Sequence, residues 1–107
     1  MANLDRLFNA LSDPTRRAIL QDLRRGPATA GALGAAHPMA LPSFMKHLGV
    51  LERAGLIETE KQGRTRSCRL APGALVPVSA WLADQRLLWE ERTERLAAFV
   101  ENHEERR

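Results

Sequence analysis

The sequence predicts a mainly α-helical protein with one small β-hairpin, in the order helix, helix, helix, helix, strand, strand, helix. Three observations lead to this prediction. Apolar residues recur at spacings of three and four along most of the 107 residues, as in amphipathic helices. Glycine and proline interrupt that pattern repeatedly and divide the chain into short elements. Between residues 56 and 70 the pattern changes to β-branched and alternating residues, which is typical of paired strands.

The first two helices are expected over residues 3–11 and from Pro14 to Arg24-Arg25. Asp13 can accept hydrogen bonds from the free amides of the turn that follows it, and Pro14 suits a first helical position. The Gly26-Pro27 pair then ends the second helix. The apolar side of the first helix consists of Leu4, Leu7, Phe8 and Leu11.

Two arginines, Arg16 and Arg17, fall in the first turn of the second helix. Positive charge is slightly unfavourable there because the helix dipole already places partial positive charge at this end. We therefore expect these arginines to pair with Asp13 or with an acid of another subunit rather than with DNA.

The next two helices are short and joined by a tight turn at residues 37–40. Thr29 is the expected N-cap of a helix over Ala30–Ala36. The fourth helix opens with Pro42 and continues to Ala54, with Gly55 as its C-terminal cap. Its expected core stripe is Phe44, Leu48 and Leu51.

A two-stranded hairpin is expected from Leu56–Glu60 and Thr65–Leu70, with a turn at residues 61–64. Four cations and no acid lie between Lys61 and Arg69, although the net charge of the chain is only +3. This local charge is typical of a surface that binds a polyanion, and a solvated charged face is the alternative. A long helix over about Leu75 to His103 follows, and Pro77 lies in its first turn or the helix starts just after it.

This order of elements is that of a winged helix-turn-helix domain, which we expect residues 1–107 to form as a single domain. The fourth helix can lie in a major groove of DNA. The basic hairpin can then reach the adjacent backbone or minor groove.

Three segments carry a family resemblance: residues 8–20 (FNALSDPTRRAIL), 46–57 (KHLGVLERAGLI) and 63–66 (GRTR). Together they closely resemble the ArsR-type winged-helix repressors, in order and with consistent spacing over nearly the whole chain. The resemblance implies a homodimer, joined through its first and last helices, that binds an operator in double-stranded DNA. It also implies release of the operator on sensing a signal, so an unidentified effector is a possible partner.

The resemblance makes the fourth helix the recognition helix. Ser43 can bond to a base edge or a phosphate, Lys46 to guanine or a phosphate, and Met45 can contact a thymine methyl group. Family members usually carry a small hydroxyl residue where this chain has Ala40 and Met45. The residues expected to face or flank DNA are Leu41, Pro42, Ser43, Met45, Lys46 and His47, with Lys61, Gln62, Arg64 and Arg66 of the hairpin.

The expected dimer interface combines apolar residues of the first and last helices. Two alternatives remain open: Trp81 and Trp89 can line a ligand pocket, and the stripe of the first helix can be intramolecular core. The interface residues are Leu4, Leu7, Phe8, Leu11, Trp81, Leu82, Leu88, Trp89 and Leu96.

We expect no metal ion and no cofactor. Many ArsR-type relatives bind metal through cysteines in the third helix or through Asp, His and Glu on the last. Here Thr29–Ala36 contains none of these residues, and His37, His47 and His103 lie on different elements. Cys68, the single cysteine, is interpreted as a packing residue, with a redox switch as the alternative.

Other classes of protein have little support. No apolar run approaches the roughly 20 residues that cross a bilayer, and the N-terminus lacks the features of a secretion signal, so we expect no membrane partner and a cytoplasmic location. A Gly-rich phosphate loop and a catalytic triad are both missing, which argues against an enzyme. The alternative function is a protein-interaction module that dimerises through its long C-terminal helix without binding DNA.

Overall fold

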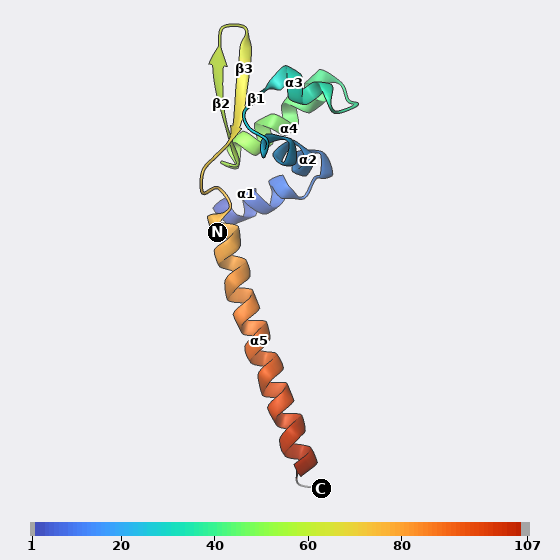
Figure 1. The fold of residues 1–107 in the computed structure, drawn as a ribbon, viewed down its shortest axis with the longest axis vertical. Coiled ribbons are helices and arrows are strands. Elements are labelled where there is room, and N and C mark those ends of the chain that lie inside the picture. Colours follow the sequence, from blue (N-terminus) through green and yellow to red (C-terminus); the bar gives the residue numbers. More distant parts are fainter. Residues whose placement is uncertain (1, 106–107) are drawn as a thin grey trace. The chain divides into compact units, whose positions relative to one another are not determined.

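The computed structural model describes residues 2–105, which form two compact units dividing between Val76 and Pro77 (Figure 1). The second unit consists of helix α5, Val76–Glu105, from Pro77 onward. The expected order of helices and hairpin strands is confirmed, within a mainly helical fold. The first unit contains α1 (Ala2–Leu11), α2 (Pro14–Leu23), β1 (Ala28–Thr29), α3 (Ala30–Ala35), α4 (Leu41–Arg53), β2 (Ile57–Gln62) and β3 (Thr65–Leu70).

The starts of α2 and α3 are set by side-chain caps, as the sequence predicts. Oδ2 of Asp13 accepts a hydrogen bond from the backbone N–H of Arg16 at 3.0 Å, and Pro14 occupies the first helical turn. Oγ1 of Thr29 accepts from the N–H of Ala32 at 3.1 Å. The end of α2 is at Leu23, so its expected extension through Arg24-Arg25 is not part of the helix.

The core of the first unit is built around α4. The predicted stripe is confirmed, because Phe44, Leu48 and Leu51 are all buried. Gly34 of α3 allows close packing against α4, since a Cβ atom at this position would lie 3.2 Å from Cδ1 of Phe44. The other elements contribute the buried residues Leu4, Leu7, Ile19, Leu23, Leu33, Ile57 and Cys68.

The sheet has three antiparallel strands in the order β1-β3-β2, one more than the sequence predicts. Ala28 and Thr29 of β1 pair with Cys68 and Ser67 of β3. A two-residue strand has no periodicity of its own, so only its pairing with β3 defines it. The strand β2 also extends to Gln62, which shortens the hairpin turn to Gly63 and Arg64. Gly63 has a φ of 63°, as the first position of a tight hairpin turn requires.

The chain passes from α4 into β2 through a glycine with a φ of 77°, Gly55. Its N–H donates to the carbonyl of Glu52 at 3.0 Å, and the N–H of Leu56 donates to the carbonyl of Leu51 at 3.0 Å. These two hydrogen bonds satisfy carbonyl groups at the end of α4, as in a Schellman motif. They also fix the hairpin of β2 and β3 relative to α4.

The helix α5 begins at Val76 and carries Pro77 in its first turn, as predicted. Its 30 residues correspond to a length of about 45 Å. Leu82, Trp89 and Leu96 follow one another at seven-residue spacing and are exposed, with Trp89 at 67%. The helix therefore presents an apolar stripe that its own unit does not cover. Within residues 2–105, no helix combines the length and the apolar character that crossing a membrane requires.

Candidate nucleic-acid interface

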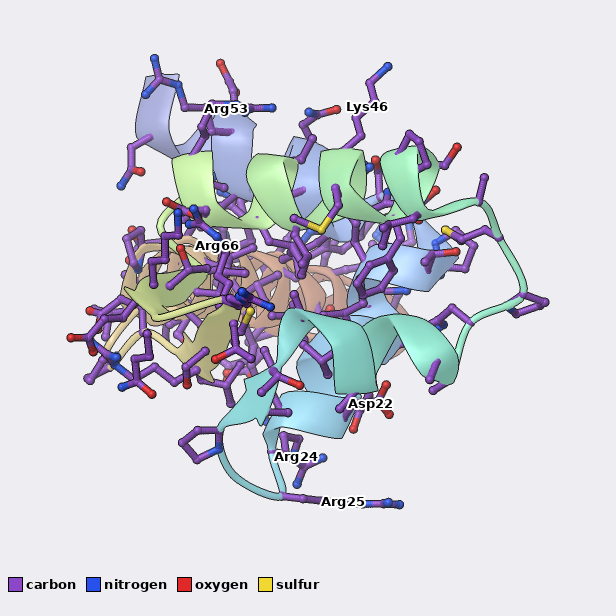
Figure 2. The ribbon with its side chains drawn as sticks, turned by 90° about the horizontal axis from the view of Figure 1, so that it is seen from above. Asp22, Arg24, Arg25, Lys46, Arg53 and Arg66 are labelled. Carbon is purple, nitrogen blue, oxygen red and sulfur yellow. The ribbon has the colours of Figure 1, made fainter. Side chains whose placement is uncertain are left out.

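The helix α4 exposes five of the ten predicted DNA-contacting residues. Because Phe44, Leu48 and Leu51 turn toward the core, the residues on the opposite side of the helix face solvent. Figure 2 shows Lys46 pointing away from α3 on this side. The predicted residues Leu41, Pro42, Ser43, Met45 and Lys46 are all exposed.

A further cation on this face, Arg53, is missing from the sequence-based set. It follows Lys46 by seven residues, or two helical turns, and points to the same side of α4 (Figure 2). Its Nη1 atom lies 3.1 Å from the position that a Cβ atom at Gly49 would occupy, so the guanidinium lies back over the glycine. The spacing of Lys46, Gly49 and Arg53 within the predicted helix is the signal that could have identified it.

Arg53 also borders a shallow hollow between α1 and α4. The hollow has a volume of about 360 Å³. Two guanidinium groups, those of Arg6 and Arg53, are among the groups that line it, with no carboxylate. Its lining is Arg6, Asn9, Val50, Arg53 and Ala54. The positive charge of the α4 face therefore continues onto α1.

The first turn of α4 has no side-chain cap. Ala40 occupies the N-cap position with a φ of −63° and a ψ of 145°, which is the extended conformation of an N-cap residue. An alanine has no oxygen to accept from the amides of the first turn, as the sequence indicates. Pro42 lies within this turn and has no N–H to satisfy.

His47, a predicted phosphate donor, lies at the inner edge of α4 rather than on its outward face. The residue is half-buried, and its Nδ1 atom lies 3.1 Å from Nη1 of Arg16 and 3.8 Å from Oδ2 of Asp13. The structure thus brings His47 together with the start of α2 and separates it from the exposed side chain of Lys46.

The expected ion pair of Arg16 and Arg17 with Asp13 does not form, and pairing with an acid of another subunit stays a prediction. Asp13 accepts the backbone amide of Arg16, whereas both guanidinium groups bind backbone carbonyls at the end of α1. Arg16 donates to Asn9 and Ala10 at 2.9 and 2.8 Å, and Arg17 donates to Leu11 at 2.8 Å. The last carbonyls of a helix have no partner within it and carry partial negative charge, which favours a cation there.

The carboxyl group of Asp13 is stabilised as the anion. The hydrogen bond from the Arg16 amide is the main cause that lowers the pKa of Asp13, and the charge of Arg16 lowers it further. At the corner between α1 and α2, the carboxylate of Asp13 and the guanidinium of Arg16 therefore lie beside the imidazole of His47 from α4.

The two faces of the hairpin differ in charge. Residues opposite each other on β2 and β3 share a face, so Lys61 lies beside Arg66 on the face that also carries Thr59 and Cys68. Nη1 of Arg66 donates to Oγ1 of Thr59 at 2.8 Å, and that hydroxyl donates to Oε2 of Glu52 on α4 at 2.8 Å. Arg66 thus extends toward α4 (Figure 2).

On the other face of the hairpin, Arg69 is neutralised by acids of the neighbouring strand. Its Nη2 and Nη1 atoms lie 2.9 Å from Glu58 and 3.8 Å from Glu60. The absence of acids between residues 61 and 69 therefore overstates the positive charge of the hairpin. In the part of the chain that the structure describes, Lys61 and Arg64 form no ion pair and are both exposed.

Cys68 lies in the core, with 0% of its surface exposed. Burial raises the pKa of its thiol, and the nearby Arg66 opposes this effect only in part. A reactive thiol needs an exposed electropositive setting, so this environment supports the packing interpretation.

The other two histidines have local partners. Nε2 of His37 lies 3.2 Å from Oδ2 of Asp22, and its ring stacks on Phe44. His103 stacks on Phe99 within α5. Within the described range of 2–105, no three side chains of His, Cys, Asp or Glu come together as a metal site would need.

The predicted dimer residues differ in exposure. On α1, Leu4 and Leu7 are buried in the single chain, whereas Leu11 is half-buried and Phe8 is 39% exposed. On α5 the predicted residues keep large exposed surfaces, although Trp81, the least exposed, reaches only 38%. The exposed α5 residues are Trp81, Leu82, Leu88, Trp89 and Leu96.

Comparison with known proteins identifies a matching domain family and two related transcriptional regulators. A family model described as a helix-turn-helix domain matches residues 11–60, which contain α2, α3 and α4. The HTH-type transcriptional regulator Rv2034 of Mycobacterium tuberculosis is 39% identical over 71 residues, 66% of this chain and 66% of that protein. The transcriptional repressor SdpR of Bacillus subtilis is 38% identical over 61 residues, 57% of this chain and 68% of that protein. The matched part of the chain spans about two thirds of each of these relatives.

Two solved structures are similar over more of the chain. A crystal structure of an ArsR family transcriptional regulator has 53% sequence identity and a TM-score of 0.80, covering 83% of this chain and 92% of that chain. A homodimeric winged helix-turn-helix DNA-binding domain from Mycobacterium bovis, solved by NMR and described as a possible ArsR-family regulator, has 28% identity and a TM-score of 0.64. That match covers 80% of this chain and 82% of the other.

Proposed function

Because the chain belongs to the ArsR family of winged helix-turn-helix transcriptional regulators, we propose that it represses transcription by binding an operator in double-stranded DNA as a homodimer. One observation carries the proposal. Lys46 and Arg53 form an exposed cationic row on α4, and the hairpin that α4 leads into adds Lys61 and Arg64. A helix of this kind in a major groove, with a basic hairpin on the backbone beside it, is a geometry that reads duplex DNA.

The two parts of this surface have different roles. The first half of α4 lies in the groove, with Ser43 as a hydrogen-bonding group for a base edge and Met45 as an apolar contact for a thymine methyl group. Lys46 binds a phosphate beside them, and Leu41 and Pro42 flank the contact. The hairpin supplies contacts to phosphates that are independent of sequence, from Lys61, Gln62, Arg64 and Arg66. Arg53 adds a phosphate contact at the far end of α4.

The proposed dimer buries the apolar stripe of α5 together with the exposed part of α1. Leu82, Trp89 and Leu96 supply the centre of this interface, and Phe8 and Leu11 extend it, while Leu4 and Leu7 support α1 from within the chain. Two-fold symmetry then matches two half-sites of an operator palindrome about 34–36 Å apart. Residues 1–107 act as one functional domain in this proposal, and repression follows from occupation of the operator. The homodimeric domain from Mycobacterium bovis supports the assembly.

The proposal assigns no catalytic role and no cofactor to the protein, which acts in the cytoplasm. An effector regulates it only if the effector binds the free and the DNA-bound dimer with different affinity. The shallow hollow on α5, about 430 Å³ and lined by polar residues beside Leu88 and Trp89, is open and does not identify such a molecule.

Fluorescence anisotropy tests this proposal, with the DNA upstream of the protein's own gene as the probe. Binding is measured at two salt concentrations, with and without EDTA, against scrambled competitor DNA. We expect preferential binding to the upstream DNA that weakens steeply with salt and is unchanged by EDTA. Equal binding to both DNAs would overturn the assignment of a nearby operator and favour a protein-interaction role for α5.

A further inference from the structure

The side chain of Arg16, on α2, joins two other elements of the first unit. Its Nε and Nη2 atoms donate to the carbonyl oxygens of Ala10 and Asn9, at 2.8 and 2.9 Å, at the end of α1. Its Nη1 atom reaches Nδ1 of His47 on α4 at 3.1 Å. One guanidinium group therefore spans from the helix of the proposed dimer interface to the helix that enters DNA.

The chemistry of this contact fixes the state of His47. A guanidinium group only donates hydrogen bonds and stays protonated in proteins, so the ring nitrogen that faces it must accept. The tautomer that makes this contact therefore carries its proton on Nε2. Two charged groups at the start of α2 lie near Nδ1 of His47, those of Arg16 at 3.1 Å and Asp13 at 3.8 Å. The carbonyl oxygens of α1 bind Arg16. The His47 side chain is 21% exposed, which limits its reach toward a phosphate.

We propose that Arg16 is a positioning residue for DNA binding, which holds α4 against the end of α1 through Nδ1 of His47. This inference rests on the proposed function. In the proposed dimer, α1 belongs to the interface, so the Arg16–His47 contact sets the placement of each recognition helix relative to the dimer axis. His47 then acts on the orientation of α4, in place of the phosphate contact that the sequence predicts.

The neighbouring arginine provides a matched control. Arg17 also donates to a carbonyl at the end of α1, that of Leu11 at 2.8 Å. Among the described residues it forms no hydrogen bond or ion pair with α4. We expect Arg16→Ala to weaken binding to the upstream DNA about tenfold, as for a residue that is energetically coupled to the DNA-binding helix. Arg17→Ala, which lacks this coupling, should change the affinity less than about threefold. Thermal unfolding by circular dichroism records the loss of the α1 contacts in both variants. Equal effects of the two variants on DNA affinity would overturn the proposal.

The salt dependence of binding separates positioning from direct contact. The slope of log K against log salt is negative, and removal of one phosphate contact makes it less steep by about 0.9. We expect this change for Lys46→Ala. Arg16→Ala should weaken binding at every salt concentration with the slope of the wild type. If the slope of Arg16→Ala becomes less steep, as in Lys46→Ala, then Arg16 contacts phosphate directly and the positioning role is overturned.

Two substitutions of His47 test the proposal where Arg16→Ala fails to fold. His47→Asn places an amide oxygen near the position of Nδ1 and can still accept from Arg16, whereas His47→Gln extends its polar group toward the position of Nε2. We expect His47→Asn to bind DNA within about threefold of the wild type and His47→Gln to bind about tenfold more weakly. The reverse order would mean that Nε2 contacts a phosphate, and the positioning role would be wrong.

The two levels of the proposal fail differently. If the wild type shows no preference for the upstream DNA at any salt concentration, the proposed function falls, and the role of Arg16 in it falls with it. If the wild type binds that DNA specifically and the Arg16 and His47 variants match their controls, only the positioning role is overturned.

Discussion

Arg69 and Glu58 are direct cross-strand partners, and Nη2 of the arginine lies 2.9 Å from Oε2 of the glutamate. Glu60 adds a second carboxylate, 3.8 Å from Nη1 of Arg69. This arrangement pairs one of the four cations of the basic segment with two acids of the neighbouring strand. One face of the hairpin therefore carries two carboxylates and one cation, and the other face carries the two cations Lys61 and Arg66.

The balance on Arg69 leads to a prediction about salt dependence. Arg64→Ala and Lys46→Ala should each weaken DNA binding, because each removes one phosphate contact. Each should also make the negative slope of log K against log salt less steep by about 0.9. Arg69→Ala is the matched control and should leave the slope close to that of the wild type. Anisotropy titrations at four or more salt concentrations measure these slopes. Unchanged affinity in both Arg64→Ala and Lys46→Ala would contradict the assigned DNA surface.

Arg53 gives a prediction that the sequence alone did not make. Arg53→Ala should make the negative slope of log K against log salt less steep by about 0.9. It should weaken binding to specific and scrambled DNA by a similar factor, since a phosphate contact carries no sequence information. Arg25, an exposed arginine on the opposite side of the first unit (Figure 2), is the control. If Arg25→Ala and Arg53→Ala bind alike, the cationic row on α4 does not extend to Arg53.

Glu52, near the end of α4, accepts a hydrogen bond from the hydroxyl of Thr59, which in turn accepts one from Arg66. Glu52→Gln keeps an acceptor for this hydroxyl and removes a negative charge from α4. We expect DNA to bind about threefold more tightly, which corresponds to an exposed charge interaction of about 0.6 kcal/mol. Glu52→Asp, which retains the charge, should bind as the wild type does. Tighter binding by both variants would assign the effect to packing instead of charge.

The uncapped start of α4 gives a prediction about stability. Ala40 already has the extended backbone of an N-cap residue but no side-chain acceptor. Ala40→Ser should therefore raise the free energy of unfolding by about 1 kcal/mol, the typical value of a serine cap over alanine. Urea denaturation measures the change, and Ala40→Val, which has no oxygen, serves as the control. Equal stability of the Ser and Val variants would mean that the first turn of α4 gains nothing from a cap.

The burial of Cys68 predicts low thiol reactivity. Because burial raises its pKa, the reactive thiolate is scarcer at pH 8 than for an exposed cysteine, and it increases only at higher pH. Reaction with a disulfide reagent at pH 8 should be slow in the native protein and fast in urea. Cys68→Ser should destabilise the fold by about 1–3 kcal/mol through an unsatisfied buried hydroxyl, and Cys68→Ala by less. Rapid reaction of the native thiol would instead support a redox role.

Much of this architecture follows from local features of the sequence. The caps at Asp13 and Thr29, the glycine after α4 and the core stripe of Phe44, Leu48 and Leu51 are as predicted. Each depends on residues within about one or two turns of each other, where backbone geometry alone limits the outcome. The α4 surface could be assigned for the same reason, although Arg53 was overlooked at a spacing of seven residues.

Interactions between distant residues were decided only by the tertiary structure. β1 exists because Ala28 meets Cys68, 40 positions later in the chain. Arg69 forms an ion pair with Glu58 across the hairpin, and His47 contacts Arg16, which lies 31 positions earlier in the chain. Hydrogen bonds and ion pairs act over a few ångströms, whereas sequence patterns describe separations along the chain. The sequence by itself therefore determined every element except β1, the core face of α4 and the family of the protein, and the fold decided which charged groups pair with one another.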